Sequence, residues 1–147
     1  LHPPPGARER GARSSNALSC VLRVGSAHGA ALITGDLLAD GERALLAAGA
    51  PLAADLLVAP HHGSRTSSTE AFIAAVGARD VVHAVGYRNR FNHPNPVIQA
   101  RYAAQGSRQL RSDRDGAVAC DFRAAGIECA LSREADARYW HNHVPVQ

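Results

Sequence analysis

The stretch that decides the fold is Leu52-Ala-Ala-Asp-Leu-Leu-Val-Ala-Pro-His-His-Gly-Ser64, a short apolar run that ends in two imidazoles, a glycine and a hydroxyl. The same design occurs upstream in Ala31-Leu-Ile-Thr-Gly-Asp36, which ends in a carboxylate, and a third polar loop contains Asn92-His-Pro94. Polar groups at the ends of successive strands converge on one edge of a sheet, where α/β folds bind ligands. Aspartate and neutral histidine are ligands of zinc or manganese. The stretch therefore predicts an α/β fold with a metal-dependent hydrolytic site.

The rest of the chain alternates strand and helix patterns, which fits a layered α/β architecture in one domain of 147 residues. Ser67 to Glu70 fits a capping box that opens a helix ending at Gly77. Segment 3–15 is a loop by composition, and 133–147 forms a C-terminal tail. Strands are expected at 18–24, 30–34, 55–59, 80–85, 108–111, 117–122 and 127–131, and helices at 38–48, 67–76, 96–105 and 133–141. The last three strands are expected to close the fold, the first two of them joined by the turn 113–116.

These motifs, taken in order, resemble the metallo-β-lactamase-like domain at the C-terminus of ComEC-type DNA-uptake channel proteins. The resemblance implies part of an αβ/βα sandwich, in which two sheets pack face to face with helices outside. It covers nearly the whole chain. The matching pieces are Leu1-His-Pro3, Asn16-Ala-Leu-Ser-Cys-Val-Leu-Arg23, Leu32-Ile-Thr-Gly-Asp36, Ala54 to Ser64, Gly86-Tyr-Arg-Asn-Arg-Phe-Asn-His-Pro94 and Arg138-Tyr-Trp-His141.

One motif of that superfamily, His-x-His-x-Asp-His, does not occur in the chain. The chain begins at Leu1, within a family motif, so the expectation is that it is the C-terminal part of a larger polypeptide whose remaining half carries those ligands. The alternative is a degenerate relative that binds no metal. A half-sandwich would leave one sheet face uncovered, which predicts an exposed apolar surface for the missing half.

Composition supports a folded domain, because 46% of the residues are hydrophobic. No apolar run approaches the roughly 20 residues that cross a bilayer, so the membrane spans of a channel protein are expected outside this chain. The resemblance implies a parent protein in the bacterial inner membrane, with this domain soluble and extracytoplasmic. The net charge of +3 is too small to indicate nucleic-acid binding by itself.

The cysteines leave two states open. Cys20 lies in an apolar run and is expected to be buried. Cys120 and Cys129 flank a plausible hairpin turn and could pair across two strands in an oxidising compartment. Two buried free thiols are the favoured interpretation.

Three residues are the candidate metal ligands. Asp36 follows a glycine at a strand end, where a carboxylate can bridge two cations, although it could instead cap the next helix. His62 is favoured over its neighbour because its spacing to Ser64 resembles the last ligand motif of related nucleases. Only the resemblance makes His2 a ligand. Two divalent cations, zinc or manganese, are expected in a complete domain, and three ligands are too few to close such a site.

The remaining site candidates lie in two loops. His61 would contact substrate phosphate or a second carboxylate, and His93 would protonate a leaving oxygen or hold a phosphoryl oxygen. Ser64 is a candidate for binding substrate, with turn capping as its other role. Arg88, Asn89 and Arg90 are the further substrate-binding candidates, expected to grip the phosphate backbone of DNA while an aromatic neighbour, Tyr87 or Phe91, stacks on a base.

The resulting hypothesis is a metal-dependent phosphodiesterase domain that degrades the non-imported DNA strand during uptake. Its nuclease activity rests mainly on the resemblance, since the residues alone support metal-assisted hydrolysis. The alternatives are a stand-alone metallo-hydrolase of a small ester or phosphodiester, and a DNA-binding relative without catalysis. The expected partners are DNA, the missing half of the domain and the membrane channel of the same protein.

Overall fold

The computed structural model describes residues 1–6 and 14–138. The middle of the expected loop 3–15 therefore lies outside the described residues. So do the aromatic segment from Tyr139 to His141, which ends the expected helix 133–141, and most of the expected tail. The described part of that expected helix is helical only as far as Ala135. Within the described part, no helix is both long and apolar enough to cross a membrane.

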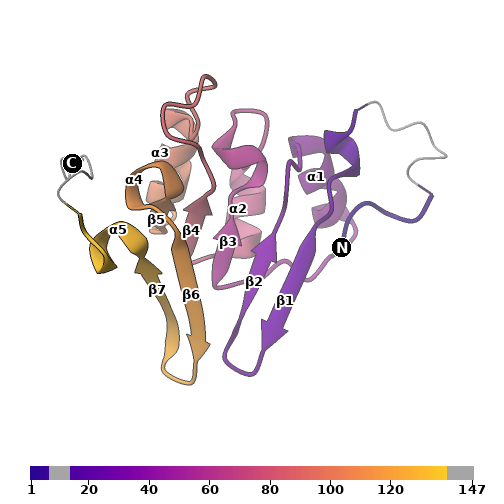
Figure 1. Cartoon of the computed structure of the whole chain (residues 1–147). Helices are drawn as coiled ribbons and strands as arrows, with labels where there is room; N and C mark the ends of the chain where they lie inside the picture. The colour runs from indigo at the N-terminus through magenta and orange to yellow at the C-terminus, as the bar shows by residue number, and fades with distance from the viewer. Residues whose placement is uncertain (7–13, 139–147) are drawn as a thin grey trace.

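Five strands form the main sheet in the order β1-β2-β3-β4-β5 (Figure 1). β1 pairs with β2 in an antiparallel hairpin, whereas β2, β3, β4 and β5 run parallel to one another. Because parallel strands end at the same edge, the loops that follow β2, β3 and β4 lie together. The strands are β1 Leu22–Ser26, β2 Gly29–Ile33, β3 Leu56–Val58, β4 Asp80–His83 and β5 Arg108–Arg111.

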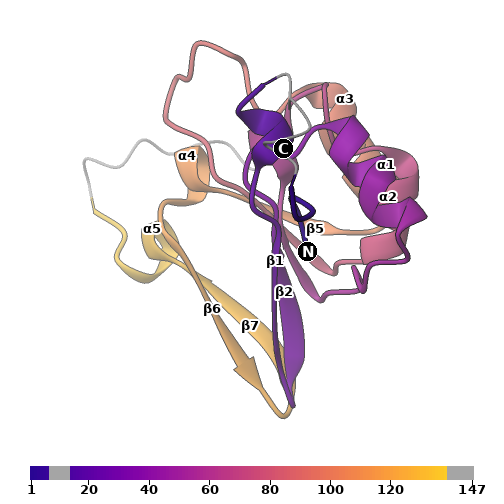
Figure 2. The same cartoon turned by 90° about the vertical axis from the view of Figure 1, so that its right-hand side faces the viewer.

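Three helices connect the successive parallel strands and all cover the same face of the sheet (Figure 2). They are α1 Ala39–Ala47, α2 Glu70–Val76 and α3 Pro96–Ala104. Each connection advances to the next strand in the same direction, so right-handed crossovers place every helix on one side. The expected alternation of strand and helix is confirmed, and the protein is α/β.

The core lies between this sheet face and the helices. Leu32, Leu57 and Val81 occupy paired positions on three neighbouring strands, and all are fully or almost fully buried. Burying such an aliphatic side chain contributes about 1.5–3 kcal/mol relative to leaving it exposed. The helices and loops add Leu37, Leu45, Phe72, Ile73, Val76, Ile98 and Tyr102.

The start of α2 differs from the expected capping box. The N-cap is Thr69, so the helix begins at Glu70, while Ser67 is buried in the preceding loop. The carboxylate of Glu42, on α1, accepts hydrogen bonds from the backbone N–H groups of Ser68 and Thr69. The carboxylate that binds backbone N–H groups at the start of α2 is thus that of Glu42, which is distant in the sequence, and not that of Glu70 as the capping box implied. Burial raises the pKa of Glu42, and these hydrogen bonds oppose that shift.

The closing strands do not form one unit. β5 belongs to the main sheet, and the short helix α4, Ser112–Asp115, separates it from β6, Val118–Arg123. β6 pairs instead with β7, Gly126–Leu131, in a separate two-stranded sheet, and α5, Ser132–Ala135, follows. The expected link between the segments 108–111 and 117–122 is present and contains α4, but the two strands lie in different sheets because β5 takes the parallel position beside β4.

Both favoured interpretations of the cysteines were wrong. Cys120 and Cys129 face each other in the β6–β7 register and form a disulfide. Cys20 is a free and exposed thiol, because the chain before β1 forms a short 3₁₀ turn, Asn16–Leu18, and β1 starts only at Leu22. The early part of the apolar run 18–24 is therefore not strand.

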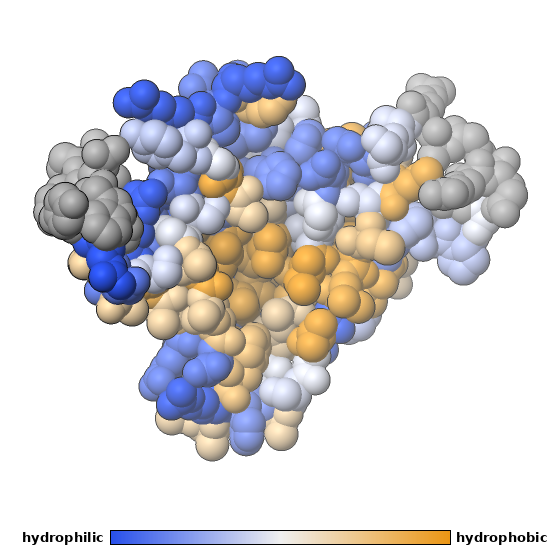
Figure 3. Space-filling model, in the orientation of Figure 1, coloured by the Kyte–Doolittle hydropathy of each residue, from blue (hydrophilic) through white to orange (hydrophobic). Residues whose placement is uncertain are grey.

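The sheet face opposite the helices is largely uncovered and apolar. Leu22, Val24 and Ile33 are exposed there on β1 and β2, and Val58 is partly exposed on β3. Figure 3 shows apolar side chains gathered across this face, over β1 to β4. We call it the open face. The exposed apolar surface that the resemblance implied is therefore present, and the complete αβ/βα sandwich stays a prediction.

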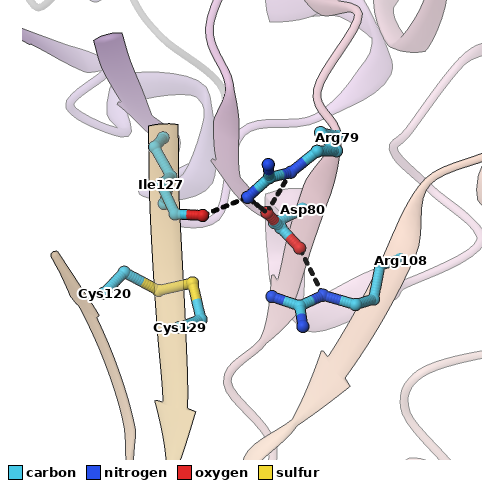
Figure 4. The surroundings of a disulfide bond; sticks show 6 residues. All are labelled: Arg79, Asp80, Arg108, Cys120, Ile127 and Cys129. Atoms are coloured by element: carbon cyan, nitrogen blue, oxygen red, sulfur yellow. Dashed lines mark hydrogen bonds and ion pairs between the residues drawn. A yellow bond between two sulfur atoms is a disulfide. The ribbon is translucent and has the colours of Figure 1, made fainter. Parts of the chain in front are cut away.

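The β6–β7 hairpin lies against the open face near β4 (Figure 4). Asp80 is fully buried and forms ion pairs with Arg79 at 2.8 Å and with Arg108 at 2.5 Å. Arg79 also donates a hydrogen bond to the carbonyl oxygen of Ile127 on β7. These bonds attach the hairpin to one part of the open face, and the ring of Phe122 on β6 approaches Gly29 at the start of β2.

Candidate functional site

Three loops meet where the parallel strands end (Figure 1). Asp36 follows β2, His61 and His62 follow β3, and His93 lies in the long loop after β4. This topology brings side chains that are far apart in the sequence to one edge of the sheet. The convergence predicted from the strand ends is confirmed.

Backbone hydrogen bonds hold the loops against each other. The N–H of His61 donates to the carbonyl oxygen of Gly35 at 2.9 Å, and the N–H of Asn95 donates to that of Gly63 at 2.9 Å. The middle loop is thus tied to both of its neighbours. The histidines are fixed relative to the loops that carry Asp36 and His93.

The middle loop has an uncommon backbone conformation. His61, His62 and Gly63 have φ angles of 49°, 59° and 83°, so three successive residues are left-handed. Such conformations cost about 1–3 kcal/mol for a non-glycine residue and cluster at functional sites. At Gly63, an added Cβ would lie 2.7 Å from Pro94 and 2.9 Å from His83 Nδ1, so only glycine allows this approach.

Asp36 and His62 form the closest pair of candidate ligands. Oδ1 of Asp36 lies 3.3 Å from Nε2 of His62, and the two side chains are 43% and 50% exposed. Two ligand atoms of a tetrahedral zinc ion also lie about 3.3 Å apart when each bond is about 2.0–2.1 Å long. The pair therefore fits two corners of a zinc site. The alternative role of Asp36 does not occur, because the N-cap of α1 is Leu38.

His2 lies beside the loop that carries Asp36, but no measured contact joins it to that carboxylate. Its Nδ1 is 2.9 Å from the carbonyl oxygen of Ser19, whose hydroxyl accepts a hydrogen bond from the N–H of Asp36 at 2.7 Å. Among residues 1–6 and 14–138, no group of three histidine, cysteine or acidic side chains is close enough to hold one ion. Its role as a ligand stays a prediction.

His61 makes different contacts from those of its neighbour. Its Nδ1 lies 3.1 Å from the hydroxyl of Thr66, which is in turn 3.0 Å from the hydroxyl of Ser64. Its Nε2 lies 3.5 Å from the side-chain amide of Asn16, and its ring meets that of His93 edge-on at 6.1 Å. Ser64 is buried within this network. The hydroxyl of Ser64 therefore supports the ring of His61 through the hydroxyl of Thr66.

His93 is held at the inner end of its loop. Its pKa is lowered, first by burial and then by the charges of His61 and His62. Its Nδ1 is buried and has no hydrogen-bond partner among the described residues. The side chain of Asn89 binds the backbone N–H and carbonyl of His93 at 2.9 and 2.7 Å. Asn89 thus shapes the loop in this conformation.

The two arginine candidates lie at the exposed end of the same loop. The guanidinium of Arg88 lies 5.2 Å from the centre of the Tyr87 ring, and that of Arg90 lies 4.8 Å from the centre of the Phe91 ring. Both arginines and both rings are exposed. Their placement is compatible with phosphate binding.

The sequence interpretation missed the supporting residues. Ser19, Asn16 and Thr66 contact candidate site residues, but hydroxyl and amide side chains in loops carry no distinctive pattern. His83 lies in the expected strand 80–85 and is fully buried. It nevertheless supports the site, because its ring lies directly beneath Gly63.

Comparison with known proteins gives this geometry a context. No protein-family model matches the chain. The competence protein ComA of Neisseria gonorrhoeae is 40% identical over 126 residues, which cover 85% of this chain and 18% of that protein. The ComE operon protein 3 of Bacillus subtilis is 30% identical over 105 residues, which cover 71% of this chain and 14% of that protein. This chain is similar to a segment of competence proteins.

The similarity to competence proteins extends over most of the described structure. The uncharacterized protein YcaI of Escherichia coli K12 is also 30% identical, over 148 residues that cover 98% of the chain and 19% of that protein. In each case the chain spans less than a fifth of the relative's length. The homologues support a competence-related protein.

Proposed function

We propose that the chain contributes the catalytic edge of a metal-dependent phosphodiesterase that acts on DNA during uptake. The observation that carries the proposal is the pair formed by Asp36 and His62, which meet at 3.3 Å at the carboxyl edge of the sheet. The similarity to competence proteins supports DNA as the substrate. Both side chains are about half exposed, so the pair is accessible to a substrate.

Each residue of the site would have a separate role. Asp36 and His62 would hold the metal, and His2 would join them in the complete site. When bound, divalent cations neutralise charge on a phosphoryl group and help to generate a nucleophile from water. The lowered pKa of His93 keeps its imidazole neutral near pH 7. A neutral imidazole favours a role in which His93 donates a hydrogen bond to a phosphoryl oxygen over a role as a protonated general acid.

The open face supports the sandwich architecture. Exposed apolar side chains on β1 and β2 would be buried by a second sheet. The relatives are more than five times as long as the aligned segment, so their chains have room for such a partner layer. We propose that the covering layer belongs to the same polypeptide and supplies the remaining metal ligands.

The disulfide supports an extracytoplasmic location. Cys120 and Cys129 are bonded across the hairpin, and such bonds persist in oxidising compartments such as the bacterial periplasm. We propose that this part of the protein folds outside the cytoplasm, on the side where incoming DNA arrives.

The test is Asp36→Asn in the polypeptide in which the chain occurs. The amide keeps the size of the side chain but loses the charge that binds a cation. We expect manganese- or zinc-dependent cleavage of bis-p-nitrophenyl phosphate and of DNA to fall to background, with an unchanged circular dichroism spectrum. Asp40→Asn, on the exposed start of α1, is the matched control and should keep full activity. Retained cleavage in Asp36→Asn would refute the proposal.

A further inference from the structure

The loop between β4 and α3 exposes two aromatic rings beside positive charge. Tyr87 is 55% exposed and Phe91 is 62% exposed. The guanidiniums of Arg88 and Arg90 lie over these rings. Exposed cation–π contacts of this kind are weak, so the arginines can leave the rings for a stronger anionic partner. Rings that stack on bases, combined with cations that follow the backbone, characterise sites for single-stranded nucleic acid.

The side chain of Asn89 and two left-handed backbone positions shape the loop. Both donors of the Asn89 side chain are used within the loop, on the carbonyl oxygens of Gly86 and His93. Arg88 and Asn92 have left-handed φ angles of 52° and 53°, which turn the backbone sharply. The loop rises above the sheet edge in both views (Figures 1 and 2). The exposed ring of Phe91 and the guanidiniums of Arg88 and Arg90 therefore lie on a loop whose shape other contacts maintain.

A row of ring contacts connects the exposed end of the β4–α3 loop with the pair formed by Asp36 and His62. The ring of Phe91 stacks on that of His93 at 5.8 Å with an interplanar angle of 21°. The ring of His93 meets His61 at 6.1 Å, and His61 is followed by His62 at 6.4 Å. A strand held at Phe91 would thus have its next phosphates along the row of imidazoles.

We propose that this loop binds the unpaired bases of single-stranded DNA, with Phe91 as the stacking residue. This inference rests on the proposed phosphodiesterase function and narrows its substrate to single strands. In a duplex, each internal base is stacked on its neighbours, so its face cannot reach the ring. Arg88 and Arg90 bind the backbone phosphates on either side of the stacked base and give affinity without base preference.

The test measures binding without catalysis. The 147-residue chain is titrated, in buffer with EDTA, into a labelled oligothymidylate, an abasic oligomer of equal length and a duplex, and fluorescence polarisation is recorded. We expect the oligothymidylate to bind most tightly. Removing a stacking ring weakens the binding of ligands that carry bases by about 5- to 150-fold. The affinity of Phe91→Ala for oligothymidylate should therefore fall by this factor, and its affinity for the abasic oligomer should not change.

Two further variants separate stacking from charge. Arg90→Ala should weaken both single-stranded ligands and reduce the slope of log affinity against log salt by about 0.7, the value for one phosphate of a single strand. Leu22→Ala is the matched control, because it removes an exposed apolar side chain from the open face. It should bind all ligands as the wild type does.

Several results would overturn the proposal. These are wild-type affinity of Phe91→Ala for oligothymidylate, an equal loss for the abasic oligomer, a preference of the wild type for duplex, or no binding of any oligonucleotide. The binding measurements contain EDTA and involve no turnover, which separates this proposal from the proposed function. A failure of the Asp36→Asn test would leave the metal-free binding data standing.

Discussion

At the scale of single residues, the two adjacent histidines show that neighbours in sequence can have separate roles. The left-handed backbone at both positions turns their rings apart, with an angle of 57° between the ring planes. His62 faces Asp36, whereas His61 contacts Thr66 and His93. This division favours His62 as the ligand and His61 as a substrate or supporting residue.

The first prediction separates these roles by metal content. His62→Ala should lower both bound metal and turnover, because it removes a ligand. His61→Ala should retain near wild-type metal and lose activity by about 10- to 100-fold, the usual effect of a lost outer contact. Elemental analysis of the two purified variants decides the matter. If His61→Ala empties the site and His62→Ala does not, the assignment is reversed.

The second prediction concerns His83 and pH. Burial, with a smaller effect from Arg111, lowers the pKa of His83 to about 4, against the opposing effects of Gln109 and Asp113. Its folded-state pKa thus lies below the unfolded value of about 6.5, and protonation favours the unfolded chain. The stabilisation is complete above pH 6.5 and is lost as pH falls towards 4, by up to about 3 kcal/mol.

Urea unfolding at pH 7 and at pH 4.5 measures this effect. His83→Gln cannot titrate and should lose much less stability between the two values. His28→Gln, at an exposed position in the β1–β2 turn, should behave as the wild type does. Equal losses in the wild type and His83→Gln would show that other groups cause the acid sensitivity.

At the scale of elements, the β6–β7 hairpin depends on features outside the main sheet. Two strands alone are marginally stable, and this pair gains a disulfide at its centre and one hydrogen bond from Arg79 to Ile127 at its edge. The hairpin also lies beside the buried Asp80, because Arg79 contacts both Ile127 and this carboxylate. The attached hairpin therefore covers part of the open face and lies beside a buried carboxylate.

The third prediction tests the disulfide. The paired cysteines are 9 residues apart, and closing a loop of this size stabilises a fold by about 2–3 kcal/mol in the chain-entropy description. Paired replacement, Cys120→Ser with Cys129→Ser, should lower the free energy of unfolding by this amount. Protein exported to the periplasm should react with a thiol reagent only at Cys20. Three reactive thiols in the exported protein would contradict both the bond and the proposed location.

At the scale of the whole molecule, the helices cover one face of the sheet, and the β6–β7 hairpin covers only part of the other. A soluble protein rarely keeps a contiguous apolar surface of this kind exposed. The site loops lie along the sheet edge beside this face (Figure 2). A layer that covers the open face would therefore also approach Asp36 and His62, which is the direction from which further ligands would come.

The fourth prediction follows from the exposed apolar surface. The isolated chain should self-associate through the open face, and Val24→Asp should shift it towards the monomer with little effect on stability, since this side chain is exposed. Val97→Asp adds the same charge on α3, on the helix side, and should leave association unchanged. Sedimentation velocity at several concentrations measures both. Equal self-association of the two variants would show that the chains associate through a surface other than the open face.

The sequence by itself determined the order of strands and helices and the loops that carry the candidate site. These follow from local apolar runs, turn residues and helix ends, such as Gly77 after α2 and Pro96 at the start of α3. The resemblance added the competence context and the expected open face. Only the tertiary structure showed that Asp36 faces His62, that β5 and β6 belong to different sheets, and that Glu42 caps a distant helix. These depend on contacts between residues far apart in the chain, whose geometry is set by packing and strand register. The disulfide was missed for the same reason, because only the β6–β7 register places Cys120 opposite Cys129.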